Sequence, residues 1–140
     1  MSTEYKLRVR YSETSAQKFV YHANYFAWMD TVQSEFLRKN GISIRELEEQ
    51  GIRFMPLDVK CKYYAPAYFE DELTITMRVV GLSNVKTHLE YMIVRDSDGK
   101  TIAKCSAAYA CMSENFRPLV MKNVLPDLYA LLKKTAEEQK

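Results

Sequence analysis

The first part of the chain changes from the period of a strand to the period of a helix. Residues 5–11 alternate apolar and basic side chains, which predicts a half-buried strand. From about Asn24 apolar residues return every three or four positions, which predicts a long helix that ends at Gly41. Ser43 and Glu46 have the spacing of a capping box and predict a second, short helix. The apolar stripe of the long helix holds Tyr25, Met29, Val32 and Phe36, with Trp28 beside them.

From Gly51 to the last helix the pattern is typical of β-structure. Pro66 ends the first of these strands, Gly81 ends the second, and the turn at 96–99 joins the last two in a hairpin. Residues 125–138 form an amphipathic pattern that predicts a closing helix. The alternating segments that predict strands are 54–64, 73–80, 87–94 and 101–112.

Five strands and one long apolar helix predict an α+β fold in which a sheet wraps around the helix. We expect a single domain over residues 1–140, because the chain has no internal repeat or linker. Apolar residues make up 47% of the composition, and a chain of this length buries roughly two-thirds of its unfolded surface. A core without disulfides or metals is therefore expected.

Charge and cysteine content narrow the classes of partner. With 20 basic and 18 acidic residues the net charge is only +2, which argues against a nucleic-acid binder. Cys61, Cys105 and Cys111 are an odd number without C-x-x-C spacing, so we interpret them as small buried residues in a reducing compartment. No apolar run is long enough to span a membrane, and the N-terminus lacks a signal-peptide core. We expect a soluble cytoplasmic protein.

The segment with the most candidate chemistry is 10–25, directly before and into the long helix. It holds hydroxyls, a carboxylate, an imidazole and an amide, followed by aromatic residues. A segment that only joined a strand to a helix would not need so many reactive side chains. We therefore expect the functional site here.

This segment also carries a resemblance to a known family. Its run Tyr-Ser-Glu-Thr-Ser-Ala-Gln-Lys-Phe-Val-Tyr-His-Ala-Asn-Tyr resembles the signature of hotdog-fold acyl-CoA thioesterases of the 4-hydroxybenzoyl-CoA thioesterase type. Residues 64–73, 83–93 and the Asp-Gly hairpin also resemble that family. The resemblance implies a five-stranded antiparallel sheet around one long central helix. It further implies a homodimer joined edge to edge, often paired into a homotetramer, with active sites at the dimer interface.

Two motif positions depart from the family pattern Asp-x-x-Gly. Ser15 stands at the aspartate position and Lys18 at the glycine position, while His22 matches a histidine of one family branch. In the family the aspartate attacks the thioester or activates water, and backbone N–H groups at the helix start hold the oxyanion. A serine needs a nearby base to do the same. A family branch that acts on enediyne-type polyketides also lacks the acid and still hydrolyses thioesters.

The resemblance thus implies hydrolysis of an acyl-CoA or acyl-carrier-protein thioester, without a metal or redox cofactor. Ser15, His22 and Glu13 are the expected catalytic residues, with Glu13 able to share a face with Ser15 in an extended segment. The expected substrate contacts are Tyr21, Asn24, Tyr25 and Lys86, the last from charge alone.

Structural roles for the same residues stay open. His22 can cap the helix, Ser15 can be an ordinary loop hydroxyl, and Glu13 can be a structural carboxylate. Asn24 is favoured as an N-cap, and Tyr25 as part of the core. The alternative function is a non-catalytic hotdog domain that binds an acyl-CoA or pantetheine group, or a scaffold that binds no thioester.

Overall fold

The computed structural model describes residues 3–139 and confirms the predicted order of elements. A 3₁₀ turn (Tyr11–Glu13) and a four-residue helix (α3) add to that order. The helices are α1 (Asn24–Lys39), α2 (Ile44–Glu49), α3 (Met121–Val124) and α4 (Pro126–Glu138). The strands are β1 (Glu4–Arg8), β2 (Ile52–Tyr63), β3 (Glu72–Leu82), β4 (Lys86–Arg95) and β5 (Thr101–Ser113).

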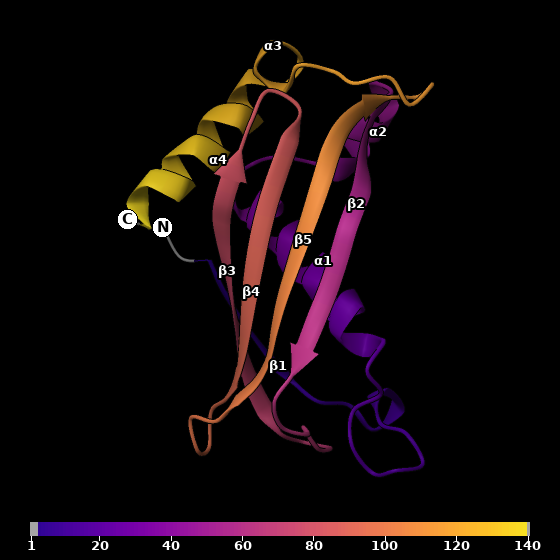
Figure 1. Ribbon diagram of the computed structural model, residues 1–140, viewed down its shortest axis with the longest axis vertical. Helices are drawn as coiled ribbons and strands as arrows, with labels where there is room; N and C mark the ends of the chain where they lie inside the picture. Colours follow the sequence, from indigo (N-terminus) through magenta and orange to yellow (C-terminus); the bar gives the residue numbers. More distant parts are fainter. Residues whose placement is uncertain (1–2, 140) are drawn as a thin grey trace.

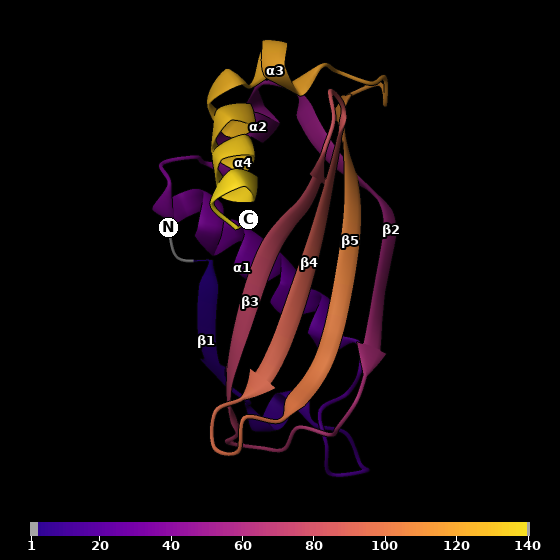
Figure 2. The same cartoon turned by 60° about the vertical axis from the view of Figure 1, so that its left-hand side comes forward.

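The five strands form one antiparallel sheet in the order β1-β3-β4-β5-β2. The sheet curves around α1, which runs behind it in Figure 1, and Figure 2 shows α4 on the same side as α1. This is the predicted α+β hotdog architecture, with one long helix inside a curved sheet. The long strand β2 stands at one end of the sheet and pairs only with β5 within residues 3–139.

The apolar stripe of α1 forms the centre of the core, as predicted. Met29 is fully buried, and the other members of the stripe are nearly so. On the opposite side of α1, Ala27, Asp30 and Thr31 are exposed. Burial of one stripe stabilises the helix against the sheet and leaves a polar side free.

The position of Gly81 differs from the prediction. It does not end β3; the strand runs on to Leu82, and the register shifts between Val79 and Gly81. A β-bulge of this kind places an extra residue in one strand. A Cβ at Gly81 would lie only 3.2 Å from the Cβ of His88 on β4. This close approach favours glycine at the bulge.

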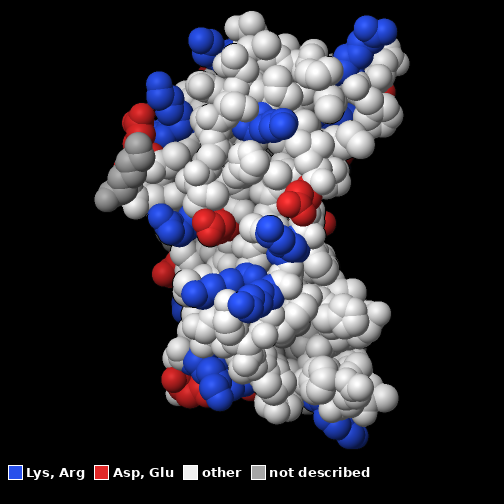
Figure 3. Space-filling view, in the orientation of Figure 1, with Lys and Arg blue, Asp and Glu red and all other residues white. Residues whose placement is uncertain are grey.

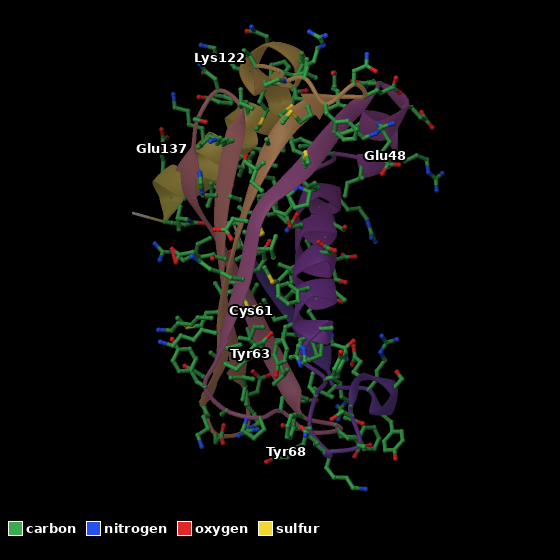
Figure 4. All side chains as sticks on the ribbon, turned by 45° about the vertical axis from the view of Figure 1, so that its right-hand side comes forward. Glu48, Cys61, Tyr63, Tyr68, Lys122 and Glu137 are labelled. Atoms are coloured by element: carbon green, nitrogen blue, oxygen red, sulfur yellow. A yellow bond between two sulfur atoms is a disulfide. The ribbon has the colours of Figure 1, made fainter. Side chains whose placement is uncertain are left out.

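The interpretation of all three cysteines as free thiols is wrong. Cys61 and Cys105 form a disulfide between β2 and β5, with their Cα atoms 4.0 Å apart. They are directly opposite in the register of the two strands, which a sequence without strand pairings does not reveal. Cys111 is the buried free thiol, and burial raises its pKa. In Figure 4, Cys61 lies on β2 beside α1, and its sulfur is 3.7 Å from the sulfur of Met29.

The closing helix α4 covers the part of β3 that β1 does not reach. β1 pairs with the lower half of β3, up to Thr76. Beyond it, the Gln139 side chain accepts from the Val79 N–H at 3.2 Å and donates to its carbonyl at 3.1 Å. Within the described chain, no helix is long and apolar enough to cross a membrane.

Basic and acidic side chains are mixed on the outer face of the sheet. Figure 3 shows the basic ones in several separate groups, with acidic side chains between them. The ammonium groups of Lys62 and Lys104 lie over the ring of Tyr64, at 5.5 and 5.7 Å from its centre. A continuous basic stripe of the kind that follows a phosphate backbone is not formed on this face.

Candidate active site

The loop between β1 and α1 is folded onto the segment that precedes β3. The Val20 N–H donates to the Ala67 carbonyl at 2.9 Å, and Phe19 forms a β-bridge with Tyr68. Asp71 holds this second segment, because its carboxylate accepts from the Tyr68 N–H at 2.8 Å and from Arg95 at 3.0 Å. The loop therefore rests on an ordered support at the lower end of the sheet (Figure 1).

Glu13 connects the loop to α1. Its residue is only 7% exposed, and its Oε1 accepts from the Arg10 N–H at 2.7 Å. Its Oε2 accepts from the indole N–H of Trp28 at 2.7 Å. Its carbonyl accepts from the Tyr21 N–H at 2.9 Å and from the Asn24 amide at 2.7 Å. With its carboxylate nearly buried and both oxygens bonded, Glu13 anchors the loop to α1.

Ser15 and Lys18 form a tight turn inside the loop. The Ser15 N–H and the Phe19 carbonyl are 2.9 Å apart, and the Lys18 N–H donates to the Ser15 carbonyl at 2.9 Å. The Ser15 hydroxyl accepts from the Gln17 N–H at 3.2 Å and donates to the Phe19 carbonyl at 3.4 Å. Lys18 has φ 77°, the left-handed conformation that glycine adopts without strain. Lys18 therefore stands at a position of this turn where glycine would be relaxed.

His22 is exposed at the end of the loop. Its ring centre lies 4.6 Å from that of Tyr21 and 6.5 Å from that of Tyr63, which stands near the lower end of β2 in Figure 4. The Tyr63 hydroxyl donates to the His22 carbonyl at 3.3 Å. Among residues 3–139, neither ring nitrogen of His22 has a hydrogen-bond partner, and no contact joins His22 to Ser15. The structure therefore places the two expected catalytic residues in one loop without forming a Ser–His pair.

The N-terminus of α1 is open. Ala23 occupies the N-cap position, no side chain caps the helix, and its first turn holds no acidic residue. The N–H groups of Tyr21 and Asn24 are bonded to carbonyls, whereas those of His22 and Ala23 have no acceptor in the described part of the chain. Two free donors and the positive end of a 16-residue helix favour a developing negative charge at this point.

Three of the predicted substrate contacts lie in different surroundings. Asn24 is not the N-cap; it is the first residue of α1, and its amide bonds to Glu13. Tyr25 is buried against Trp28 and Tyr63, at ring distances of 5.0 and 5.1 Å, and burial raises its pKa to about 12. Lys86 begins β4 at the end of the sheet far from the loop, because β4 runs the length of the sheet (Figure 1).

A cavity of about 480 Å³ lies farther along α1, and the sequence did not indicate it. It is bounded by α1, α2, α4 and the inner face of the sheet. On one side, Gln33 donates to the hydroxyls of Tyr91 and Tyr109 at 2.6 and 2.9 Å. Asp30 lies one turn earlier, and partial burial raises its pKa. The one sign of the cavity in the sequence was the pair Asp30 and Gln33, two polar residues three positions apart in an apolar helix.

Glu35, a further carboxylate in α1, lies away from this cavity. It forms an ion pair with Arg38 at 2.9 Å and borders a separate small hollow next to β1. It therefore has no part in the geometry around the start of α1.

Comparisons with known proteins agree with this architecture. The sequence pattern of the Thioesterase-like superfamily matches residues 9–126. The acyl-CoA thioester hydrolase YbgC of Escherichia coli O6:H1 is 28% identical over 116 residues, which are 83% of each chain.

Solved structures share the fold. The DHNA-CoA thioesterase of Staphylococcus aureus superimposes with a TM-score of 0.88 at 23% identity, covering 98% of this chain and 94% of that one. The Dynemicin thioesterase superimposes with a TM-score of 0.85 at 21% identity, covering 96% and 97%. At these identities the likeness shows the fold.

The anchoring role of Glu13 predicts a large loss of stability when the carboxylate is removed. We expect Glu13→Ala to lower the free energy of unfolding by about 2–4 kcal/mol, because it leaves the buried Trp28 N–H and the Arg10 N–H without acceptors. Trp28 is the single tryptophan, so its fluorescence in a urea titration reports the change directly. Glu72→Gln, which alters an exposed ion pair with Arg8, is the control and should cost less than about 1 kcal/mol. An equal loss of unfolding free energy in the two variants would contradict the anchoring role of Glu13.

The left-handed backbone of Lys18 predicts that a glycine substitution at this position stabilises the protein. We expect Lys18→Gly to raise the free energy of unfolding by about 0.5–1 kcal/mol, since glycine has no Cβ to clash in this conformation. The neighbouring exposed Gln17 has a negative φ, so Gln17→Gly should lower stability by a similar amount. Urea denaturation of both variants checks the prediction, and destabilisation by Lys18→Gly would refute it.

Proposed function

The chain belongs to the thioesterase-like superfamily, and from that premise we propose that it hydrolyses acyl-CoA thioesters to a free acid and CoA. The observation that carries the proposal is the open N-terminus of α1, where the N–H groups of His22 and Ala23 have no acceptor within residues 3–139. Donors held in place before the reaction are what an oxyanion needs. The relationship to an acyl-CoA thioester hydrolase supports the same chemistry.

In this proposal the thioester carbonyl oxygen sits at the start of α1. It accepts hydrogen bonds from the His22 and Ala23 N–H groups, and the helix dipole adds to their effect. Water attacks the carbonyl carbon, and the oxygen becomes an oxyanion. When the tetrahedral intermediate collapses, the C–S bond breaks and CoA leaves as a thiolate that takes up a proton. The loop holds the start of α1 in place, because Glu13 accepts hydrogen bonds from the side chains of Asn24 and Trp28.

The water is activated by His22 in this scheme. We do not assign this step to Glu13, because its carboxylate is nearly buried and already bonded through both oxygens, nor to Ser15, because its hydroxyl donates inside its own turn. The His22 ring has free nitrogens and lies next to the two proposed oxyanion donors. It can take a proton from water and return it to the leaving thiolate. The Ser15 hydroxyl donates its proton to the Phe19 carbonyl, so it orients the water only by accepting a hydrogen bond from it. Tyr21, which is half-exposed beside His22, contacts the substrate.

We further propose that two copies of the chain join through β2 into a homodimer, which can pair again into a homotetramer. The outer edge of β2 is unpaired over 12 residues within the described chain. A long open edge is a template for pairing with another strand. Its exposed apolar side chains are Met55, Leu57 and Tyr63, and the exposed Tyr64 follows directly after the strand. Since Tyr63 contacts the His22 carbonyl, a second copy on β2 would cover the proposed site.

Hydrolysis and the role of His22 are tested by steady-state kinetics on short, long and aromatic acyl-CoAs. We expect turnover by the wild type and a loss of about 100-fold or more in kcat for His22→Ala, the range of general acid–base catalysis. Ser15→Ala should lose less than about tenfold, and Ser15→Asp should raise kcat because it restores a carboxylate that needs no activation. Full activity of His22→Ala would contradict the mechanism. Saturable binding of CoA esters without turnover would favour the non-catalytic alternative.

The homodimer is tested by sedimentation velocity and activity of a β2 variant. We expect Met55→Lys/Leu57→Lys to sediment as a monomer and to lose most of its activity, because like charges meet where two apolar edges would pair. Val80→Lys is the control; Val80 is 45% exposed on β3, close to the 46% of Leu57. It should keep the assembly of the wild type. A wild-type protein that is monomeric at assay concentration, yet fully active, would contradict the proposal.

A further inference from the structure

Phe116 stands in the turn after β5 in a state that its own chain does not explain. Its side chain is 63% exposed, and its φ of 59° is a left-handed conformation that a bulky side chain rarely adopts. An exposed phenylalanine forgoes the gain of burial, and this backbone conformation adds strain. A glycine at the same position would avoid both costs. The residue is therefore a candidate for a contact outside its own chain.

Hydrogen bonds hold the turn in one arrangement. The Phe116 N–H donates to the Ser113 carbonyl at 2.9 Å, and the Ser113 N–H donates to the Arg117 carbonyl at 2.9 Å. The Arg117 N–H donates to the Ser113 hydroxyl at 3.2 Å. The Arg117 guanidinium is exposed and has no ion-pair partner within residues 3–139. An aromatic ring and a guanidinium thus occupy consecutive positions of an ordered turn, and both can take a ligand.

The turn lies against the start of β2. Glu114, which belongs to the turn, forms an ion pair with Arg53 at 3.5 Å. A Cβ at Gly51, directly before β2, would lie 3.2 Å from the Glu114 side chain. Figures 1 and 2 show the segment between β5 and α3 projecting past the start of β2, on the side of the open edge of the sheet. A second strand on that edge would therefore come close to the turn.

The turn is too far from the start of α1 in its own chain to serve the site there. β2 runs from the turn to the site, and its 12 residues span about 36 Å. In the proposed homodimer the two copies of β2 pair antiparallel, because a two-fold axis perpendicular to the sheet keeps both long helices on one side. Pairing over the whole strand places Ile52 opposite the partner's Tyr63. The turn then lies beside the end of β2 at which Tyr63 contacts the His22 carbonyl.

The side chains of the turn match the nucleotide end of CoA. A purine stacks on an aromatic ring, and a guanidinium pairs with phosphate oxygens. In the proposed reaction the thioester lies at the start of α1, and the pantetheine arm leads from it to the nucleotide. A pantetheine group on a carrier protein has no purine, so Phe116 would add nothing to its binding.

We propose that Phe116 and Arg117 bind the adenine ring and the phosphates of a CoA thioester that is held in the site of the partner copy. The inference rests on the proposed function and on the proposed homodimer. It assigns CoA, and not a carrier protein, as the group that delivers the acyl chain. Both residues determine specificity and take no part in the bond-breaking step.

Calorimetry with two thioethers, which cannot be hydrolysed, tests the nucleotide site. We expect the wild type to bind octyl-CoA thioether about tenfold or more tightly than octyl-pantetheine thioether. Phe116→Gly should weaken binding of the CoA thioether alone by about tenfold, the range for one base stacked on an aromatic ring, and Phe116→Tyr should keep it. Met92→Ala, which shortens a 42% exposed side chain on the outer face of β4, is the control and should change neither affinity. The thermal midpoint of Phe116→Gly should rise, because glycine relieves the strain of the turn.

Cross-linking tests the position of the turn across the dimer without any turnover. The antiparallel pairing places Gly51 opposite the partner's Tyr64, so co-expressed Phe116→Cys and Tyr64→Cys copies should be joined by a short bismaleimide. Phe116→Cys with Met92→Cys should give no covalent dimer. The native cysteines are buried or in the disulfide, and the wild type measures their background.

The outcomes separate the nucleotide site from the reaction. Equal affinity of the wild type for the two thioethers, or an unchanged preference in Phe116→Gly, would overturn the nucleotide site. Absence of the Phe116–Tyr64 cross-link would overturn its position across the dimer. A preference for the CoA thioether that depends on Phe116, together with no turnover of octanoyl-CoA, would retain the site and overturn the proposed hydrolysis.

Discussion

The buried carboxylate of Glu13 is the interaction on which the proposed site depends. A carboxylate removed from water is costly unless donors surround it, and here the Arg10 N–H and the Trp28 indole supply them. The carbonyl of the same residue receives the Tyr21 N–H and the Asn24 amide. One residue thus holds the strand exit, the loop and the first two turns of α1 in a single arrangement. Between these bonded groups lie the N–H groups of His22 and Ala23, which have no acceptor within residues 3–139.

In our proposal, Ser15 and Lys18 occupy the positions of an aspartate and a glycine in the pattern that this loop resembles. Lys18 has the left-handed conformation, in which glycine would be relaxed, so this turn carries a cost in strain. Ser15 brings no carboxylate, and its hydroxyl bonds within the turn. The oxyanion donors belong to the backbone and are unaffected by either change. In our account the chemistry therefore rests mainly on the helix start, with His22 supplying the proton transfer.

Sequence periodicity was sufficient for the elements and for the inner stripe of α1, since both depend on local spacing. It did not predict the features that depend on pairing between segments distant in the sequence. The Cys61–Cys105 disulfide depends on the register of β2 and β5, and the bulge at Gly81 depends on His88 across the ladder. The assignment of Asn24 as N-cap failed because Asn24 is already helical, and its side-chain NH2 donates to the Glu13 carbonyl, a tertiary acceptor that local spacing does not show. The hydrogen bonds of Gln33 with Tyr91 and Tyr109 beside the cavity could not be seen in the sequence, because these residues come from three separate elements, α1, β4 and β5.

The most direct test of the account is a crystal structure with an acyl-CoA analogue in which a ketone replaces the thioester. We predict that its carbonyl oxygen lies about 2.7–3.1 Å from the N–H groups of His22 and Ala23, with the His22 ring beside the carbonyl carbon. A carbonyl bound away from the start of α1, with these two N–H groups facing solvent, would contradict the central claim.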